Sequence, residues 1–262
     1  MSTLSITTIQ SNLFWEDKTA NLQMLQKKID SIEEKTEIVI LPEMFSTGFS
    51  MQPQLLAEKM DGETVEWMKT VSNKNGIVLT GSIIIEEAGK FYNRLIWMLP
   101  NGQYGYYDKR HLFAYGEEDK HYSPGNKRLI ASVKGWKINL QVCYDLRFPV
   151  WARQQPKGGQ AEYDVLIYVA NWPERRSHAW KTLLCARAIE NQCYAVGVNR
   201  VGEDAKNINY SGNSLVIDPM GQVLYHMADE EDINTIILSK EKLEEVRTKF
   251  PFLADADGFA LL

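Results

Sequence analysis

Cysteine and histidine are scarce in this chain of 262 residues, which contains three cysteines and four histidines. These residues form no Cys-x-x-Cys or His-x-x-x-His pair, the spacings that are typical of zinc sites. No glycine-rich loop stands in a setting that would hold a phosphate group. The sequence therefore predicts an activity that needs neither a metal ion nor an organic cofactor.

Long apolar runs and an excess of positive charge are absent as well. No segment reaches the about 18 consecutive apolar residues of a membrane span. The formal net charge is −5 and the basic residues are scattered, so the chain lacks the electrostatic footprint of a nucleic-acid-binding protein. We expect no membrane and no nucleic acid as partner. Three cysteines and no apolar signal region at the N-terminus lead us to expect a reducing, cytoplasmic setting.

One domain over residues 1–262 is the expected organisation, because a chain of this length with 44% hydrophobic residues can bury one large core. No linker rich in Gly, Ser or Pro divides it. The nearest candidate, Gln154 to Gln160, is short and is typical of an exposed loop.

Cys143 is the candidate nucleophile. It ends the apolar run that starts at Trp136 and is followed at once by Tyr144-Asp145-Leu146. A strand that stops abruptly at a turn presents its last side chain at the rim of a sheet, where a nucleophile can meet a substrate. A cysteine without such a context is more often a small buried apolar residue, and we interpret Cys185 and Cys193 as packing residues.

Glu43 is a candidate base. It follows the short apolar run Thr36 to Leu41, and Pro42 removes a ladder donor, so the predicted strand must end there. The next residues, Met44 to Phe49, include apolar and aromatic side chains that would raise the proton affinity of a nearby carboxylate. The alternative is a solvated loop acid.

Lys109 ends a second predicted strand, which begins at Gln103 after the turn Pro100-Asn101-Gly102. A lysine in such a place is commonly a surface charge with an apolar stem. Beside a cysteine, an ammonium group favours the thiolate and stabilises a tetrahedral oxyanion. Residues 43, 109 and 143 could therefore converge from three strand ends.

Three blocks of this chain resemble the signature blocks of the nitrilase superfamily, the carbon-nitrogen hydrolases. The blocks are Leu41-Pro42-Glu43, Tyr107 to Phe113, and Val142 to Pro149. Within the superfamily the chain is most similar to bacterial omega-amidases, which hydrolyse the terminal amide of 2-oxoacid amides such as 2-oxoglutaramate. The segments that carry this closer resemblance are Asn171-Trp172-Pro173, Ala186 to Asn191, and Phe250 to Asp257.

The resemblance implies a second glutamate, which precedes a Pro-Gly turn and lies between the lysine and the cysteine. Alignment on Ser123-Pro124-Gly125 selects Glu118, with Glu117 one residue away as the alternative. It also implies acyl transfer through a Cys143 thioester, with Glu43 as the base and no cofactor. In that scheme Lys109 and the backbone N–H of Tyr144 hold the oxyanion, and Glu118 positions the groups around Lys109.

A 2-oxoacid amide carries a carboxylate, which calls for an arginine or a cluster of N–H donors. Arg175 and Arg176 follow the predicted strand Asp164 to Ala170, and we hypothesise that one of them binds this carboxylate; the alternative is a surface charge. Phe45 and Trp172 are expected to be walls of the pocket. Arg147 is interpreted as part of the scaffold.

Asp145, two residues before Arg147, is expected to pair with it.

Two other interpretations of the function stay open at this point. One is a nitrile or N-carbamoyl amide hydrolase on the same fold, and the other is a non-catalytic binding protein that retains the fold.

The predicted elements suit an α/β fold with layered sheets, and the resemblance implies an α-β-β-α sandwich. Helices are expected from Asp17 to Glu33, after a cap at Asp61, from Ser177 to Cys193 and near Glu241 to Lys249. Strands are expected at Ser5 to Ile9, Ile77 to Ile85, Phe91 to Leu99 and in a hairpin from Ser214 to Tyr225. The family likeness further implies a homodimer, with the tail from about residue 250 to 262 at the interface; the competing view is a tail that folds back on its own subunit.

Overall fold

The computed structural model describes residues 2–155 and 160–260. Residues 156–159 of the expected loop and the last two residues of the tail, 261 and 262, lie outside the described part. The strands of the first sheet are β1 (Thr3–Gln10), β2 (Ile38–Ile40), β3 (Val78–Glu87), β4 (Lys90–Met98), β5 (Tyr104–Asp108) and β13 (Asp232–Ser239). Those of the second are β6 (Ile130–Val133), β7 (Trp136–Val142), β8 (Val165–Val169), β9 (Tyr194–Val198), β10 (Val201–Glu203), β11 (Asn209–Ile217) and β12 (Val223–Ala228).

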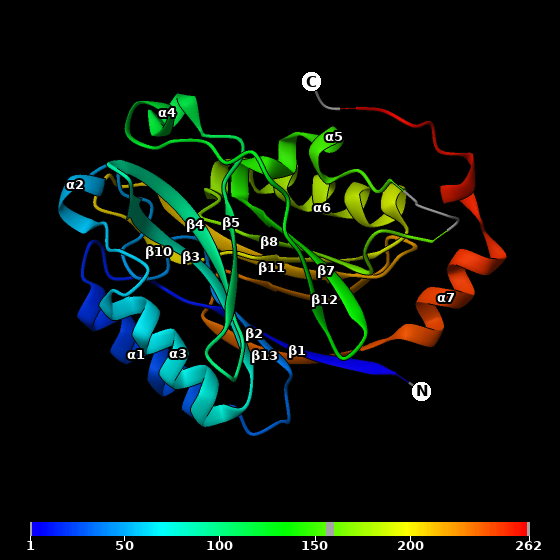
Figure 1. The fold of residues 1–262 in the computed structure, drawn as a ribbon, viewed down its shortest axis with the longest axis horizontal. Coiled ribbons are helices and arrows are strands. Elements are labelled where there is room, and N and C mark those ends of the chain that lie inside the picture. Colours follow the sequence, from blue (N-terminus) through cyan, green and yellow to red (C-terminus); the bar gives the residue numbers. More distant parts are fainter. Residues whose placement is uncertain (1, 156–159, 261–262) are drawn as a thin grey trace.

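The helices flank these two sheets. They are α1 (Lys18–Asp30), α2 (Pro53–Leu56), α3 (Glu63–Asn75), α4 (Glu118–His121), α5 (Pro149–Ala152), α6 (Ser177–Asn191) and α7 (Lys240–Lys249). In Figure 1, α1 and α3 lie on the outer side of the first sheet and α5 and α6 on the outer side of the second. The four layers form the expected α-β-β-α sandwich.

The first sheet has the strand order β13-β1-β2-β3-β4-β5. β1, β2 and β3 run parallel, and β4 and β5 continue as an antiparallel meander from β3. Alternation in β1 and β2 sends Ile6 and Ile40 into the space between the sheets, while Ile9 and Val39 pack toward α1 and α3. The end of β2 is therefore buried on both faces.

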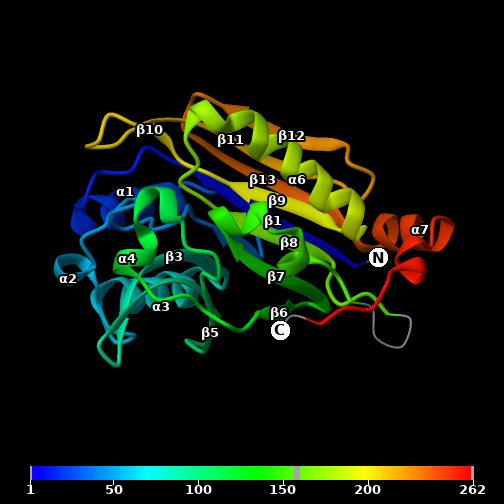
Figure 2. The same ribbon diagram turned by 90° about the horizontal axis from the view of Figure 1, so that it is seen from above.

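The second sheet has the order β10-β11-β9-β8-β7-β6. β12 stands outside this order and pairs with β11 on the edge opposite β9. β7, β8 and β9 are parallel, so their carboxyl ends share one rim of the sheet. Gly197 in β9 lies under α6, where an added Cβ would approach Leu184 and Trp180 at 2.4 and 2.6 Å. Figure 2 shows α6 lying along this sheet, above β9 and β11.

The expected elements are present, but α1 and α6 end before the predicted residues, and β1 and the hairpin of β11 and β12 extend beyond them. Asp17 caps α1 as predicted from sequence, and its carboxylate accepts from the Ala20 N–H at 2.9 Å. The predicted cap at Asp61 is wrong: α3 begins after Gly62, which makes no side-chain cap bond. No helix in the described ranges combines the length and the apolar character that crossing a membrane requires.

The start of the C-terminal tail contacts its own subunit. The Phe250 carbonyl accepts from Gln192 Nε2 at 2.7 Å, and the Leu253 N–H donates to Gln192 Oε1 at 3.2 Å. Phe252, between them in sequence, is 61% exposed. These bonds fix the direction in which the tail leaves α7 and leave an aromatic side chain on the surface.

Candidate active site

Glu43 lies three residues beyond the end of β2, at the rim of the first sheet, and its side chain is fully buried. Oε1 accepts from Lys109 Nζ at 2.8 Å and from Asn93 Nδ2 at 2.8 Å. Oε2 accepts from the backbone N–H of Asn171 at 2.8 Å, which belongs to the segment after β8. The solvated-acid alternative is therefore wrong for Glu43.

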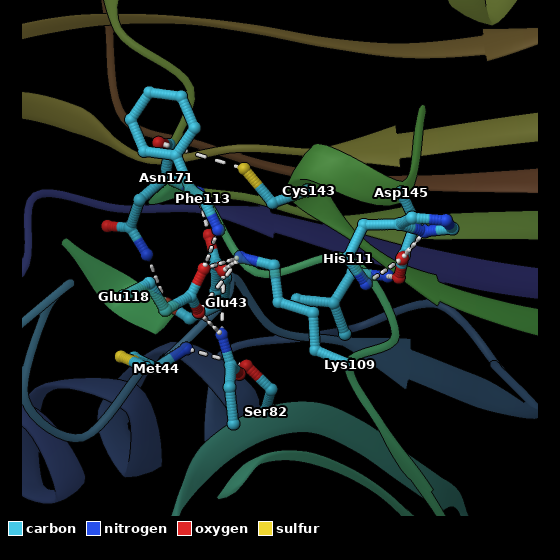
Figure 3. Close-up of polar contacts among 12 residues, drawn as sticks. Glu43, Met44, Ser82, Lys109, His111, Phe113, Glu118, Cys143, Asp145 and Asn171 are labelled. Atoms are coloured by element: carbon cyan, nitrogen blue, oxygen red, sulfur yellow. Dashed lines mark hydrogen bonds and ion pairs between the residues drawn. The ribbon is translucent and has the colours of Figure 1, made fainter. Parts of the chain in front are cut away.

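Lys109 follows directly on β5 and is 1% exposed. Its ammonium donates to Glu43 and also to both oxygens of Glu118, at 3.1 and 2.9 Å (Figure 3). Burial lowers the pKa of Lys109, but the two carboxylates and Cys143 outweigh burial and raise it above its ordinary value. The lysine is a permanent cation here, not a surface charge.

Glu118 and not Glu117 is the second glutamate of this cluster. Glu118 opens α4, is fully buried, and accepts from the Phe113 N–H at 2.7 Å besides Lys109. Burial raises the pKa of Glu118, Lys109 lowers it, Glu43 raises it, and the net shift is upward. Glu117 instead forms an exposed ion pair with Lys120 at 2.6 Å.

Cys143 stands where β7 ends and adopts the left-handed backbone conformation with φ of +45°. A residue other than glycine in this region carries strain, which is a feature of nucleophile turns. Its Sγ lies 3.9 Å from the Asn171 carbonyl oxygen (Figure 3). Burial raises the pKa of the thiol well above its ordinary value; Glu43 raises it further and Lys109 opposes both. The resting group is a thiol that needs a base.

Asp145, in the turn after Cys143, does not pair with Arg147, so that expectation was wrong. Its carboxylate accepts from the Val142 N–H at 3.0 Å, the Tyr107 hydroxyl at 2.8 Å, and both the N–H and Nδ1 of His111, at 3.0 and 2.7 Å. These bonds join the segment around Lys109 to the turn of the nucleophile. The Arg147 guanidinium lies 5.0 Å from the centre of the Trp172 ring instead.

A cavity of about 300 Å³ opens above Cys143 and Lys109. It is lined by the expected Trp172, Arg175 and Arg176, together with Arg147, Lys206 and the aromatic side chains Phe49, Phe113, Tyr115, Tyr144 and Tyr210. Phe45 is not part of this wall, which corrects the sequence-based expectation. Its ring is fully buried on the helix side of the first sheet and packs against Trp67, with centroids 5.9 Å apart.

Positive charge predominates around the mouth of the cavity. Arg175 is exposed, Arg176 is half-buried, and within the described ranges neither forms an ion pair with a carboxylate. Burial lowers the pKa of Arg176 and the adjacent Arg175 lowers it further. Two acids also line the cavity: Glu117 is paired with Lys120, and Asp204 accepts from the Tyr210 hydroxyl at 3.0 Å and from two backbone N–H groups. An anionic ligand would relieve the repulsion between these arginines.

Two residues of the hydrogen-bonded cluster around Glu43, and cavity-lining residues such as Lys206 and Tyr210, were not found by sequence reasoning. Asn93 in β4 donates to both Glu43 and Glu118, and Asn171 donates to the Glu43 backbone carbonyl through Nδ2 at 2.5 Å. A polar residue in the predicted apolar strand Phe91 to Leu99 was a usable signal for Asn93. The role of Asn171 comes largely from its backbone N–H and carbonyl, which the residue type does not reveal.

Comparison with known proteins agrees with this geometry. The model of the family described as carbon-nitrogen hydrolase matches residues 5–248. Omega-amidase YafV of Yersinia enterocolitica is 41% identical over 266 aligned residues, which cover all of both chains. The 2-oxoglutaramate amidase of Bacillus subtilis (strain 168) is 31% identical and is covered to 96%, as is this chain.

A solved structure is similar over the full length of both chains. It is XC1258 from Xanthomonas campestris, described as a CN-hydrolase superfamily protein with an arsenic adduct in the active site. Its TM-score is 0.98 at 42% sequence identity, with complete coverage of both chains. The likeness extends over both sheets and their covering helices.

Proposed function

Because the chain belongs to the carbon-nitrogen hydrolase family, we propose that it hydrolyses the terminal amide of a small 2-oxoacid amide to the acid and ammonia. 2-Oxoglutaramate and 2-oxosuccinamate are the expected types of substrate. Full-length relatives named omega-amidase and 2-oxoglutaramate amidase support this specificity. The observation that carries the chemistry is the buried cluster of Glu43, Lys109 and Glu118 beside a strained cysteine at the floor of one cavity.

The reaction begins with a neutral thiol, because burial disfavours the thiolate. Glu43 accepts the Cys143 proton as sulfur attacks the amide carbon, and the backbone N–H of Tyr144 and the Lys109 ammonium hold the oxyanion. Glu43 then protonates the leaving nitrogen, ammonia departs, and a thioester remains on Cys143. Water activated by Glu43 hydrolyses the thioester, while Glu118 keeps Lys109 in place.

Arg176 is the better candidate for binding the substrate carboxylate. It is half-buried and its guanidinium carbon lies 5.1 Å from the centre of the Phe113 ring, and Phe113 itself holds Glu118 through its backbone N–H. Arg175 is more exposed and contributes charge at the mouth. A carboxylate bonded to a desolvated guanidinium gains more than one bonded to a fully solvated guanidinium.

Ammonia release from a panel of compounds tests the reaction class. We expect turnover of 2-oxoglutaramate, slower turnover of the neutral amide of equal chain length, and little from the matching nitrile and N-carbamoyl compound. Preferred turnover of the nitrile or the carbamoyl compound would replace the proposed substrate class. No ammonia from any compound would favour a non-catalytic binding protein.

The same panel tests the arginines. Arg176→Ala should reduce the ratio of kcat/KM for the acidic amide to that for the neutral amide, and Arg175→Ala should reduce it less. Unchanged discrimination in both variants would eliminate an arginine contact to the carboxylate.

The proposed enzyme is a single-domain homodimer in the cytoplasm. The surface around Val150, Arg153 and Phe252 supports an interface that includes the tail. Val150 is 49% exposed and Phe252 is 61% exposed, so a partner subunit could bury two large apolar side chains there. Three unpaired cysteines suit a reducing compartment. Light scattering of the full chain and of a chain ending at Phe250 tests the assembly: a monomeric mass for both would refute dimerisation through the tail.

A further inference from the structure

Asn93 is a neutral side chain placed between two buried carboxylates. It is the fourth residue of β4 and is 1% exposed. Its Nδ2 donates to Glu43 Oε1 at 2.8 Å and to Glu118 Oε1 at 3.1 Å. Ionised carboxylates can only accept hydrogen bonds, so they fix the orientation of the amide with its NH₂ group toward them.

The ammonium of Lys109 is fully occupied in this arrangement. It has three N–H donors. The structure gives it three carboxylate contacts, one to Glu43 and two to Glu118. To stabilise an oxyanion, Lys109 must turn at least one of these donors away from a carboxylate oxygen. If that oxygen then had no donor in a buried site, the turn would be costly.

Each of the four carboxylate oxygens has a donor other than Lys109. Asn93 Nδ2 donates to Oε1 of Glu43 and to Oε1 of Glu118. The Asn171 N–H donates to Oε2 of Glu43, and the Phe113 N–H donates to Oε2 of Glu118 (Figure 3 labels these two donor residues). Two of the four positions therefore depend on a single amide group.

We propose that Asn93 is a positioning residue that holds Glu43 and Glu118 independently of Lys109, so that a Lys109 N–H can turn to the oxyanion during amide hydrolysis. This inference rests on the proposed function. Asn93 is not among the residues that line the cavity, and it acts through the two carboxylates. It also fixes Lys109 from the other side, because the Asn93 backbone carbonyl accepts from the Lys109 N–H at 3.0 Å.

The test compares three substitutions that separate hydrogen bonding from filling of space. Asn93→Asp keeps the shape but replaces both donors with an acceptor. Asn93→Ala removes the donors and the volume. Asn93→Thr keeps one hydroxyl donor on a side chain that suits a strand. It should fold even if Asn93→Ala does not, so the inference stays testable. The matched control is Asn139→Ala: Asn139 is a fully buried asparagine in β7 whose Oδ1 accepts from Gln141 Nε2 at 3.1 Å, and not from a residue of the site.

We expect activity to fall in the order wild type, Asn93→Thr, Asn93→Ala, Asn93→Asp. Asn93→Ala should lower kcat by about 10- to 100-fold, the change that one hydrogen bond to a charged group represents, with little change in KM. The acid limb of its kcat/KM profile should move to higher pH, because carboxylates that lose a donor hold a proton more readily. Asn139→Ala should leave both the kcat and the pH profile as in the wild type.

A role in packing alone predicts a different order, in which Asn93→Asp, which keeps the shape, is close to wild type and Asn93→Ala, which loses the volume, is the weakest. That order, or an unmoved acid limb in a folded Asn93→Ala or Asn93→Thr, would overturn the inference while the proposed function stood. A wild-type protein that releases no ammonia from any amide would overturn the proposed function, and this inference with it.

Discussion

Replacing Lys109 by methionine removes the only cation of a buried cluster that contains two carboxylates. Lys109 makes three charge-assisted hydrogen bonds, between 2.8 and 3.1 Å, to Glu43 and Glu118. Methionine is similar in length and keeps the apolar stem packed. After the change, both carboxylates retain neutral donors but face each other without a compensating charge.

The expected loss of stability at neutral pH is about 3–5 kcal/mol, the cost of removing one partner from a buried ion pair. The loss should depend on pH in a defined direction. In Lys109→Met the folded protein gains a proton on one carboxylate at a higher pH than the wild type does, whereas an unfolded glutamate titrates near its ordinary value of 4.5. The folded variant then binds more protons than the unfolded chain, so its stability falls as pH rises, by about 1.4 kcal/mol per pH unit and proton.

Urea unfolding followed by tryptophan fluorescence, from about pH 5 to about pH 8, measures this difference. The control is Lys74→Met, which breaks an exposed ion pair with Asp30 at 2.9 Å. That pair should contribute less than about 1 kcal/mol. The gap between wild type and Lys109→Met should widen from acid to neutral pH. A gap that is constant over this range, or no larger than that of Lys74→Met, would refute the assignment of a buried charge cluster.

Two further predictions concern the nucleophile and the position of Lys109. Because burial raises the pKa of Cys143 well above its ordinary value, the ultraviolet absorbance of a thiolate, measured as wild type minus Cys143→Ala, should not rise at neutral pH. A thiolate step near neutral pH would contradict the need for Glu43 as base. Gly125→Ala should lower kcat/KM by about 10²-fold, since its Cβ would stand 2.1 Å from the Asp108 carbonyl oxygen and shift the residue before Lys109. Gly258→Ala, where the added Cβ meets open space, is the control, and equal kinetics of the two variants would count against this close approach.

The strand ends could be predicted from sequence because local chemistry defines them. Pro42 marks the end of the first strand and Pro100-Asn101-Gly102 the turn before the second, and both signals act over a few residues. The pairing of strands across the two sheets could not be derived from such signals, and the sandwich was expected only through the family resemblance. The register of parallel strands depends on contacts between distant segments.

In the site, too, local signals could be predicted from the sequence and contacts between distant segments could not. Glu43, Lys109 and Cys143 stand at strand ends, where the pattern itself points to function. Phe45 was misplaced because an aromatic residue beside a strand end can face either side, and here it faces the helix layer. The predicted partner of Asp145 was wrong for a related reason. Arg147 is close in sequence, but its guanidinium lies against Trp172, whereas Asp145 is bonded by Tyr107 in β5 and by His111 in the segment after β5.

The most direct test of the account is rapid-quench mass spectrometry of the intact protein during turnover of 2-oxoglutaramate. We predict a transient mass increase equal to the acyl group, located on Cys143 and absent in Cys143→Ala, which should release no ammonia. Turnover without any adduct, or ammonia release that persists in Cys143→Ala, would contradict the claim that this sulfur attacks the amide carbon.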